Sequence, residues 1–167
     1  MTESSPLNLR RAVVWIGRLI LAGVFIYAGY SKLALPNIKP RPPIGVALSL
    51  FALQVDSFQM LPPWAVNVVA HTLPFAEIAL GVLLLIGWQL RIWATLASLI
   101  LLGFFAAVVR SYALGLQINC GCFANPEPLT IKTVIRDGML VALSLVLTIV
   151  SFVNAREPHP WSAPEKA

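Results

Sequence analysis

The chain has 167 residues, of which 58% are hydrophobic and 11% are charged, with a formal net charge of +5. Soluble domains carry charge on about a quarter of their residues, so this composition excludes an ordinary soluble domain. The lysines and arginines stand mainly between long apolar runs, which suits contact with lipid headgroups and argues against a nucleic-acid partner. We therefore expect a single membrane domain.

The first apolar run extends from Ala12 to Tyr30 and follows a polar N-terminal segment, residues 1–11, that ends in Arg10-Arg11. The run is long enough to cross a bilayer. It is long for a signal peptide, Arg18 interrupts it, and no clean small-residue cleavage site follows. We therefore predict a membrane anchor, with a cleaved signal of the twin-arginine kind as the alternative.

Residues 31–63 form the longest connection, and four prolines exclude a regular helix from its first part. The stretch from Ile44 to Phe58 then predicts a short apolar helix that carries Asp56 near its end. This helix is too short to span a bilayer, so we expect an interfacial or re-entrant segment. Leu61-Pro62-Pro63 ends it.

The second span is expected from Trp64 to Trp88. At about 100° per residue, its polar and small residues fall within an arc of about 120°. Because polar groups that face lipid are costly, this arc is expected to face the other helices. The residues in the arc are Asn67, His71, Pro74, Glu77 and Gly81.

Two ionisable residues of this span are candidate functional groups, because charge within a membrane is rare. For Glu77 we expect a structural ion pair with Arg18 of the first span, and the alternative is a role in proton or quinone chemistry. His71 is expected to hydrogen-bond to Asn67 one turn earlier, and contact with a quinone ring is its alternative role.

The third span is predicted from Ile92 to Tyr112 and the fourth from Gly138 to Val153. The very short turn before the third span predicts antiparallel neighbours. The tail, residues 154–167, is polar and rich in proline, and we expect it to be mobile. Pairs of small residues four apart permit close helix contact: Ala94 with Ser98, Gly103 with Ala107, and Gly138 with Ala142.

These elements predict an all-α fold, an integral membrane four-helix bundle over residues 12–153 with an extra interfacial helix between spans one and two. Four spans place both termini on one side and the two longer connections on the other. The counts of lysine and arginine on the two sides are nearly equal, so charge does not orient the chain. We expect the bacterial inner membrane, with cytoplasmic termini and a periplasmic Cys120/Cys122 loop, because disulfides persist outside the cytosol.

The two cysteines of the chain, Cys120 and Cys122, are separated by Gly121 and lie between spans three and four. Glycine lets the backbone bend enough for the sulfurs to meet, and the resulting small ring is expected to be strained. Strained disulfides are more oxidising and exchange more easily, so the pair predicts catalytic thiol–disulfide exchange. A Cu(I) site and two inert buried thiols are the alternatives, and no other metal site is expected.

Three cations, Arg110, Lys132 and Arg136, are expected near the thiols. Positive charge favours the thiolate, which is the nucleophile in disulfide exchange. Anchoring to lipid headgroups is an equally strong interpretation of the same three residues.

Taken in order along the chain, several segments resemble the methylamine-utilisation MauE family, within the wider DoxX-like group of four-span membrane proteins. The resemblance covers nearly the whole chain. Ala124 stands where the family commonly has glycine, and Phe58 lies where it usually has tyrosine. The matching segments are Ala28-Gly29-Tyr30-Ser31-Lys32-Leu33, Leu61-Pro62-Pro63-Trp64, Leu73-Pro74-Phe75-Ala76-Glu77, the stretch from Gly115 to Phe123, and Arg136-Asp137.

The resemblance implies a maturation factor for an exported enzyme such as methylamine dehydrogenase, whose small subunit is rich in disulfides, working with a periplasmic thioredoxin-like partner. Our first hypothesis is therefore a component of a thiol–disulfide oxidoreductase system. The alternatives are a non-catalytic membrane assembly or transport factor and a DoxX-like subunit of a quinone-linked oxidoreductase. No cofactor is firmly implied, and a quinone is the one candidate.

Overall fold

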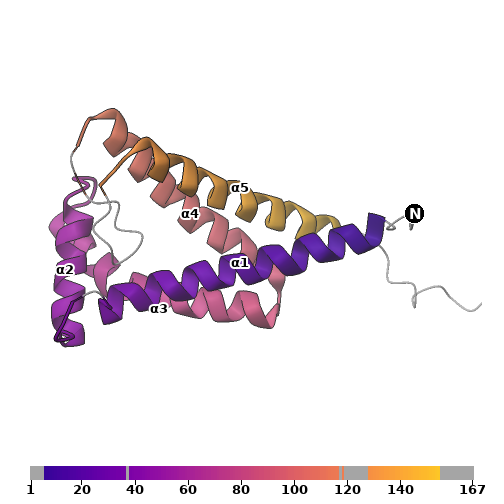
Figure 1. Ribbon diagram of the computed structural model, residues 1–167, viewed down its shortest axis with the longest axis horizontal. Coiled ribbons are helices and arrows are strands. Elements are labelled where there is room, and N and C mark those ends of the chain that lie inside the picture. The colour runs from indigo at the N-terminus through magenta and orange to yellow at the C-terminus, as the bar shows by residue number, and fades with distance from the viewer. Residues whose placement is uncertain (1–5, 37, 117, 119–127, 155–167) are drawn as a thin grey trace, which may run out of the picture.

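The computed structural model describes residues 6–36, 38–116, 118 and 128–154, and this part of the chain is helical without strands (Figure 1). Four of its helices are long and apolar enough to cross a membrane, which confirms the predicted multi-pass membrane protein. The helices are α1 (Pro6–Ala34), α2 (Ile44–Asp56), α3 (Pro63–Ile86), α4 (Leu90–Ala113) and α5 (Ile131–Asn154).

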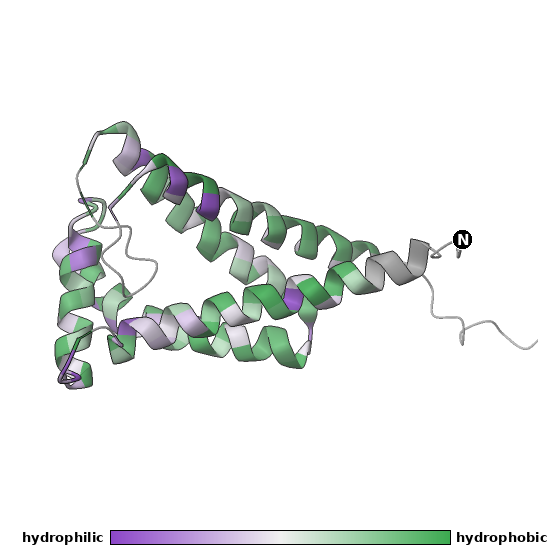
Figure 2. Cartoon of the chain, viewed as in Figure 1, coloured by the Kyte–Doolittle hydropathy of each residue, from purple (hydrophilic) through white to green (hydrophobic). Residues whose placement is uncertain are grey.

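Apolar residues cover the four long helices over most of their length (Figure 2). Many large apolar side chains are exposed on them, among them Ile86 at 67% and Leu99 at 59%. Such exposure suits helices whose outer faces contact lipid rather than water. The first span continues beyond the predicted end at Tyr30, as far as Ala34.

The four spans form two pairs, with α1 packed along α3 and α4 packed along α5. Figure 1 shows that the two pairs diverge toward the end of the molecule at which α2 lies, which we call the wide end. The short turn between α3 and α4 does make them antiparallel neighbours, but they pack on each other less than the helices within each pair.

Two glycines allow α1 and α3 to approach closely. A Cβ atom on Gly29 would lie 2.5 Å from the carbonyl oxygen of Pro74, and one on Gly81 would lie 2.6 Å from Cγ1 of Ile26. Any larger residue would therefore push the two helices apart. The buried cluster beside this crossing consists of Leu21, Ala22, Phe25, Leu80, Leu84, Ala94, Ala97 and Leu147.

Small residues also join α4 to α5, as predicted for Ala94 with Ser98, both of which are buried. The Ser98 hydroxyl lies 3.0 Å from the Thr148 hydroxyl on α5. Gly138 does face α4, because a Cβ there would lie 3.5 Å from the Phe105 ring. The prediction for Gly103 was wrong: a Cβ there would meet no atom within 4 Å, so this glycine does not bring two helices together.

The short helix α2 confirms the predicted element between spans one and two and lies across the wide end (Figure 1). It buries Ala47, Leu48 and Phe51 and packs on α1 and α3, while Leu53 on its outer side is 68% exposed. The end of α1, the start of α3, the end of α4 and the start of α5 meet at this same end. The two longer connections therefore share one side, as expected.

Candidate functional site

The predicted catalytic residues Cys120 and Cys122 lie outside the described residues. The structure does describe the chain on both sides of them, where Ile118 precedes the pair and Leu129 follows it. The amide of Leu129 donates a hydrogen bond of 3.1 Å to the carbonyl of Ile118, so the two ends of the intervening stretch are held together.

This junction between Ile118 and Leu129 is also anchored by apolar packing. Both residues pack against the buried pair Phe58 and Val108, which come from the connection after α2 and from α4. The backbone turn after α4 is fixed by a hydrogen bond of 3.1 Å from the amide of Leu116 to the carbonyl of Ser111. Ile118 and Leu129, which flank the cysteines in the sequence, are therefore packed together at the wide end.

The three predicted thiolate-supporting cations all lie toward this end, but with different surroundings. Arg110 donates a hydrogen bond of 3.4 Å to the carbonyl of Phe58, which ties α4 to the connection after α2. Lys132 is exposed near the start of α5. Arg136 is half-buried, and its Nε lies 3.1 Å from a carboxylate oxygen of Asp137. Their influence on the thiols stays a prediction.

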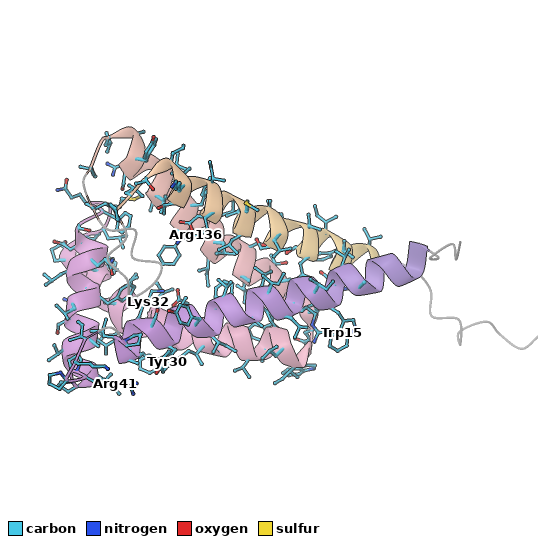
Figure 3. All side chains as sticks on the ribbon, viewed as in Figure 1. Trp15, Tyr30, Lys32, Arg41 and Arg136 are labelled. Carbon is cyan, nitrogen blue, oxygen red and sulfur yellow. The ribbon has the colours of Figure 1, made fainter. Side chains whose placement is uncertain are left out.

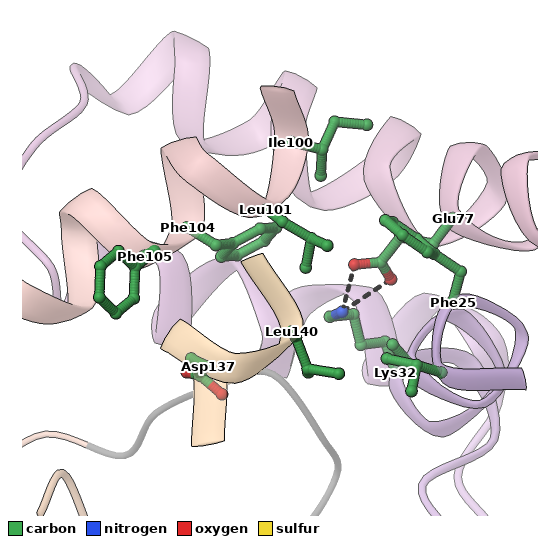
Figure 4. Close-up of a pocket in the computed structure, with 11 residues that line it drawn as sticks. Phe25, Lys32, Glu77, Ile100, Leu101, Phe104, Phe105, Asp137 and Leu140 are labelled. Atoms are coloured by element: carbon green, nitrogen blue, oxygen red, sulfur yellow. Dashed lines mark hydrogen bonds and ion pairs between the residues drawn. The ribbon is translucent and has the colours of Figure 1, made fainter. Parts of the chain in front are cut away.

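The charged pair buried deepest in the described part of the chain is Lys32 of α1 with Glu77 of α3. Lys32 is 4% exposed and Glu77 is 3% exposed. The ammonium nitrogen lies 2.7 Å from both carboxylate oxygens, as Figure 4 shows. The rings of Phe51 and Phe104 lie 5.3 Å and 5.7 Å from the same nitrogen, so Lys32 contacts α2 and α4 as well.

The predicted ion pair between Glu77 and Arg18 was therefore wrong. Arg18 instead donates hydrogen bonds of 3.0 Å and 2.9 Å to the carbonyls of Leu84 and Leu85 in the last turn of α3. Carbonyl groups at a helix C-terminus lack partners within the helix and carry partial negative charge, so an arginine is favoured there. The guanidinium also lies 4.8 Å from the centre of the Trp15 ring.

A small cavity of about 40 Å³ lies beside the Lys32–Glu77 pair and is lined mainly by apolar side chains. Asp137 of α5, 8% exposed, lines it across from the pair (Figure 4). The cavity thus brings ionisable side chains from α1, α3 and α5 to one place. It is larger than the roughly 10–15 Å³ that one water molecule needs, and it offers polar partners for water.

Lys32 and Asp137 are functional candidates that the sequence reasoning missed. A first span that ends at Tyr30, as predicted, would place Lys32 outside the membrane. Figure 3 shows Lys32 on α1 and Arg136, the neighbour of Asp137, on α5, both toward the wide end. The available signal was the family resemblance itself, since Lys32 and Asp137 both lie in segments that carry it.

The predicted inward face of α3 is correct in part. Pro74, Glu77 and Gly81 are buried, whereas Asn67 and His71 are exposed. His71 Nδ1 lies 2.9 Å from the carbonyl of Asn67, so the expected contact one turn earlier is present through the backbone. Val66 and Ala70 take the buried positions near the start of the helix, because small and apolar residues fit the contact surface better.

No cluster of three or more histidine, cysteine, aspartate or glutamate side chains that could hold a metal ion occurs in the described ranges. The alternative of a Cu(I) site concerns Cys120 and Cys122, which lie outside those ranges.

Comparison with known proteins gives one consistent family. A family model described as methylamine utilisation protein MauE matches residues 10–150. The methylamine utilization protein MauE of Paracoccus denitrificans is 34% identical over 138 residues, which cover 81% of this chain and 68% of that protein. The protein of the same name from Paracoccus versutus is 33% identical over 134 residues, covering 78% and 66%. No solved structure matches the chain.

Proposed function

The chain belongs to the family of the methylamine utilisation protein MauE, and from this membership we propose that it is a redox-associated membrane protein that exchanges disulfides through Cys120 and Cys122. Its membrane is the bacterial inner membrane, with the termini in the cytoplasm and the wide end in the periplasm. Its client is an exported enzyme of methylamine metabolism, such as the small subunit of methylamine dehydrogenase, reached through a thioredoxin-like protein.

The observation that supports this proposal is the anchoring of the described residues that flank the Cys120-Gly121-Cys122 sequence. Cys120 is the second residue after Ile118, whose carbonyl accepts the hydrogen bond from Leu129 and whose side chain packs on Phe58 and Val108. Because Ile118 and Leu129 are held together at the wide end, we expect the cysteines between them in the sequence to be within reach of a protein outside the membrane.

The proposed exchange takes place in two steps. A thiolate of the reduced thioredoxin-like protein attacks one sulfur of the Cys120–Cys122 disulfide, forming a mixed disulfide and releasing the other cysteine as a thiol. The second thiol of that protein then breaks the mixed disulfide. Two electrons and two protons have moved to Cys120 and Cys122, and the thioredoxin-like protein leaves oxidised, ready to form a disulfide in the client.

The cations at the wide end favour this step. Arg110, Lys132 and Arg136 come from the helices on either side of the cysteine segment. Positive charge nearby stabilises the thiolate that leaves when the disulfide opens. Arg110 and Arg136 are also held by Phe58 and Asp137, so their positions are fixed by the fold.

The experiment is to replace both cysteines, Cys120→Ser with Cys122→Ser, in a strain that depends on this protein for methylamine dehydrogenase. We expect the variant to accumulate in the membrane like the native chain while disulfide-bonded small subunit is lost. Ser49→Ala, at an exposed site of α2, is the control and should behave as native. If the double variant still supports a fully oxidised small subunit, the exchange proposal is wrong and the assembly-factor alternative replaces it.

A further inference from the structure

A second cavity, of about 330 Å³, lies among α2, α3 and α4 at the wide end. Sites for small molecules are usually about 300–1,000 Å³ and mainly apolar, with a few polar groups that fix orientation. The rings of Phe51, Phe58 and Phe104 form part of its wall. The cavity therefore has the size and the lining of a site for a flat apolar molecule.

One polar side chain, Gln54, lines this cavity. It is half-buried, and its amide makes no hydrogen bond to another residue in the described part of the chain. The amide offers both donors and an acceptor. Met60, Leu61 and Leu99 also line the cavity and are exposed, so the cavity borders an apolar surface.

We propose that this cavity binds the head group of an isoprenoid quinone. The flat ring of such a molecule packs on the phenylalanine rings, and a ring carbonyl accepts a hydrogen bond from the amide of Gln54. Its hydrocarbon tail leaves past Leu61 and Leu99 into the lipid. A lipid acyl chain explains the apolar wall equally well, but it offers the Gln54 amide no hydrogen-bond partner, whereas a ring carbonyl does.

This site deepens the proposed function, and it rests on that function for its redox role. The proposed exchange leaves Cys120 and Cys122 as two thiols. Re-forming their disulfide releases two electrons and two protons, and one quinone that becomes a quinol takes up both. Phe58 and Ala107 line the cavity and also belong to the cluster on which Ile118 and Leu129 pack. The proposed quinone site therefore adjoins the residues that flank the cysteines.

Gly103 offers a way to block the cavity without disturbing the helix packing. It lines the cavity, and a Cβ atom added to it would meet no atom within 4 Å. The series Gly103→Ala, Gly103→Leu and Gly103→Phe should therefore fill the space in steps. Gly23 on α1 is exposed and equally free of close neighbours but lies outside the cavity, so Gly23→Leu is the matched control.

The test measures binding of decylubiquinone to the purified full chain in phosphatidylcholine nanodiscs, with lipid in large excess over the quinone. We expect saturable binding, lowered at least about tenfold by Gly103→Leu and unchanged by Gly23→Leu. Gln54→Leu should lower affinity about threefold to tenfold, which corresponds to one lost hydrogen bond. Binding that is absent, non-saturable or insensitive to Gly103→Leu would overturn the quinone site and leave the cavity to lipid.

The redox role is tested separately, so that failure of the site and failure of the exchange are distinguishable. The variant Cys120→Ser with Cys122→Ser should bind decylubiquinone as tightly as the native chain. Reduced native protein mixed with decylubiquinone should form the disulfide and produce one quinol per pair, and Gly103→Leu should slow this at least about tenfold. If the quinone binds but no quinol forms, the proposed binding site stands and the proposed electron transfer from the cysteines is wrong.

Discussion

Lys32 and Glu77 join α1 to α3 through two hydrogen bonds of 2.7 Å, and both side chains are almost fully buried. Removing one partner of a buried pair leaves the other charge uncompensated. Removing both partners together leaves no such charge. Removing one partner should therefore cost more stability than replacing both partners with apolar residues.

We predict that Lys32→Met alone lowers the free energy of unfolding by about 3–5 kcal/mol, because Glu77 stays buried without its cation. Adding Glu77→Leu should restore most of that loss. Unfolding of the purified protein in mixed micelles with increasing denaturing detergent measures both. Lys132→Met, at an exposed cation, is the control and should change stability by less than about 0.5 kcal/mol. Equal damage in the single and double variants would contradict a direct pairing.

Arg18 provides a second test at the residue scale. Arg18→Met should cost about 1–2 kcal/mol, because the carbonyls of Leu84 and Leu85 lose their donor. Combined with Glu77→Gln, the two losses should add to within about 0.5 kcal/mol, since the two residues do not pair. A coupling energy of more than about 1 kcal/mol between the two substitutions, in the same unfolding assay, would show that Arg18 and Glu77 do pair.

The partner of Glu77 shows what the sequence could not predict at this scale. Glu77 lies within an apolar run, so the sequence predicts that it pairs with a cation. Which cation it finds depends on how far the first span continues, and Lys32 lies in the extra turn before Ala34. Hydropathy locates a span only to within a few residues, so the choice between Arg18 and Lys32 could not be made from it.

At the scale of helices, Gly29 and Gly81 decide how closely α1 and α3 approach. At both positions, a Cβ atom would lie too close to atoms of the facing helix, so only glycine permits the observed distance between the helices. Alanine is normally the better helix former, so a loss of stability on changing glycine to alanine would come from the contact between helices. Helix association in membranes depends on such close packing.

We predict that Gly81→Ala and Gly29→Ala each lower the free energy of unfolding by about 1–3 kcal/mol through overpacking. Gly23→Ala, on the same helix as Gly29 but with open space around it, should be neutral or slightly stabilising. The midpoint of unfolding in mixed micelles measures all three. No difference between Gly81→Ala and Gly23→Ala would contradict the close contact.

The helices themselves were largely predictable, because runs of some twenty apolar residues leave few alternatives. The buried face of α3 was not. Asn67 and His71 lie on the arc predicted to face inward but are exposed, and Val66 and Ala70 are buried instead. The rotation of α3 about its own axis is decided by how well it packs on the neighbouring helices. The polarity of Asn67 and His71, near the start of α3, did not outweigh that packing.

For the whole molecule, the two helix pairs and α2 place both long connections at the wide end (Figure 1). This separation of ends follows from an even number of spans and was predictable. The divergence of the pairs was not, because it depends on the glycine contacts within α1–α3 and the small residues within α4–α5. The two cavities and the buried Lys32–Glu77 pair lie where the pairs diverge.

We predict that the wide end faces the periplasm. The background is a variant in which Cys120 and Cys122 are both serine, so that a new cysteine is the only thiol. In cells with a permeabilised outer membrane, Ser49→Cys on α2 should react with a thiol reagent that does not cross the inner membrane. Gln89→Cys, in the turn between α3 and α4, should react only after the inner membrane is opened. Both positions are exposed, so access alone separates them. The opposite pattern would place the cysteine segment in the cytoplasm and contradict the proposed partner.

The thiol state of Cys120 and Cys122 in growing cells is the most direct test of whether they relay electrons in the periplasm. Cells are quenched with acid and the free thiols are alkylated, and a parallel sample is first treated with a reductant that does not cross the inner membrane. We predict a largely oxidised pair that this reductant opens, and a mixed disulfide with a thioredoxin-like protein when one cysteine is changed to serine. A pair that stays reduced, is inaccessible from outside and never forms a mixed disulfide would contradict the periplasmic relay.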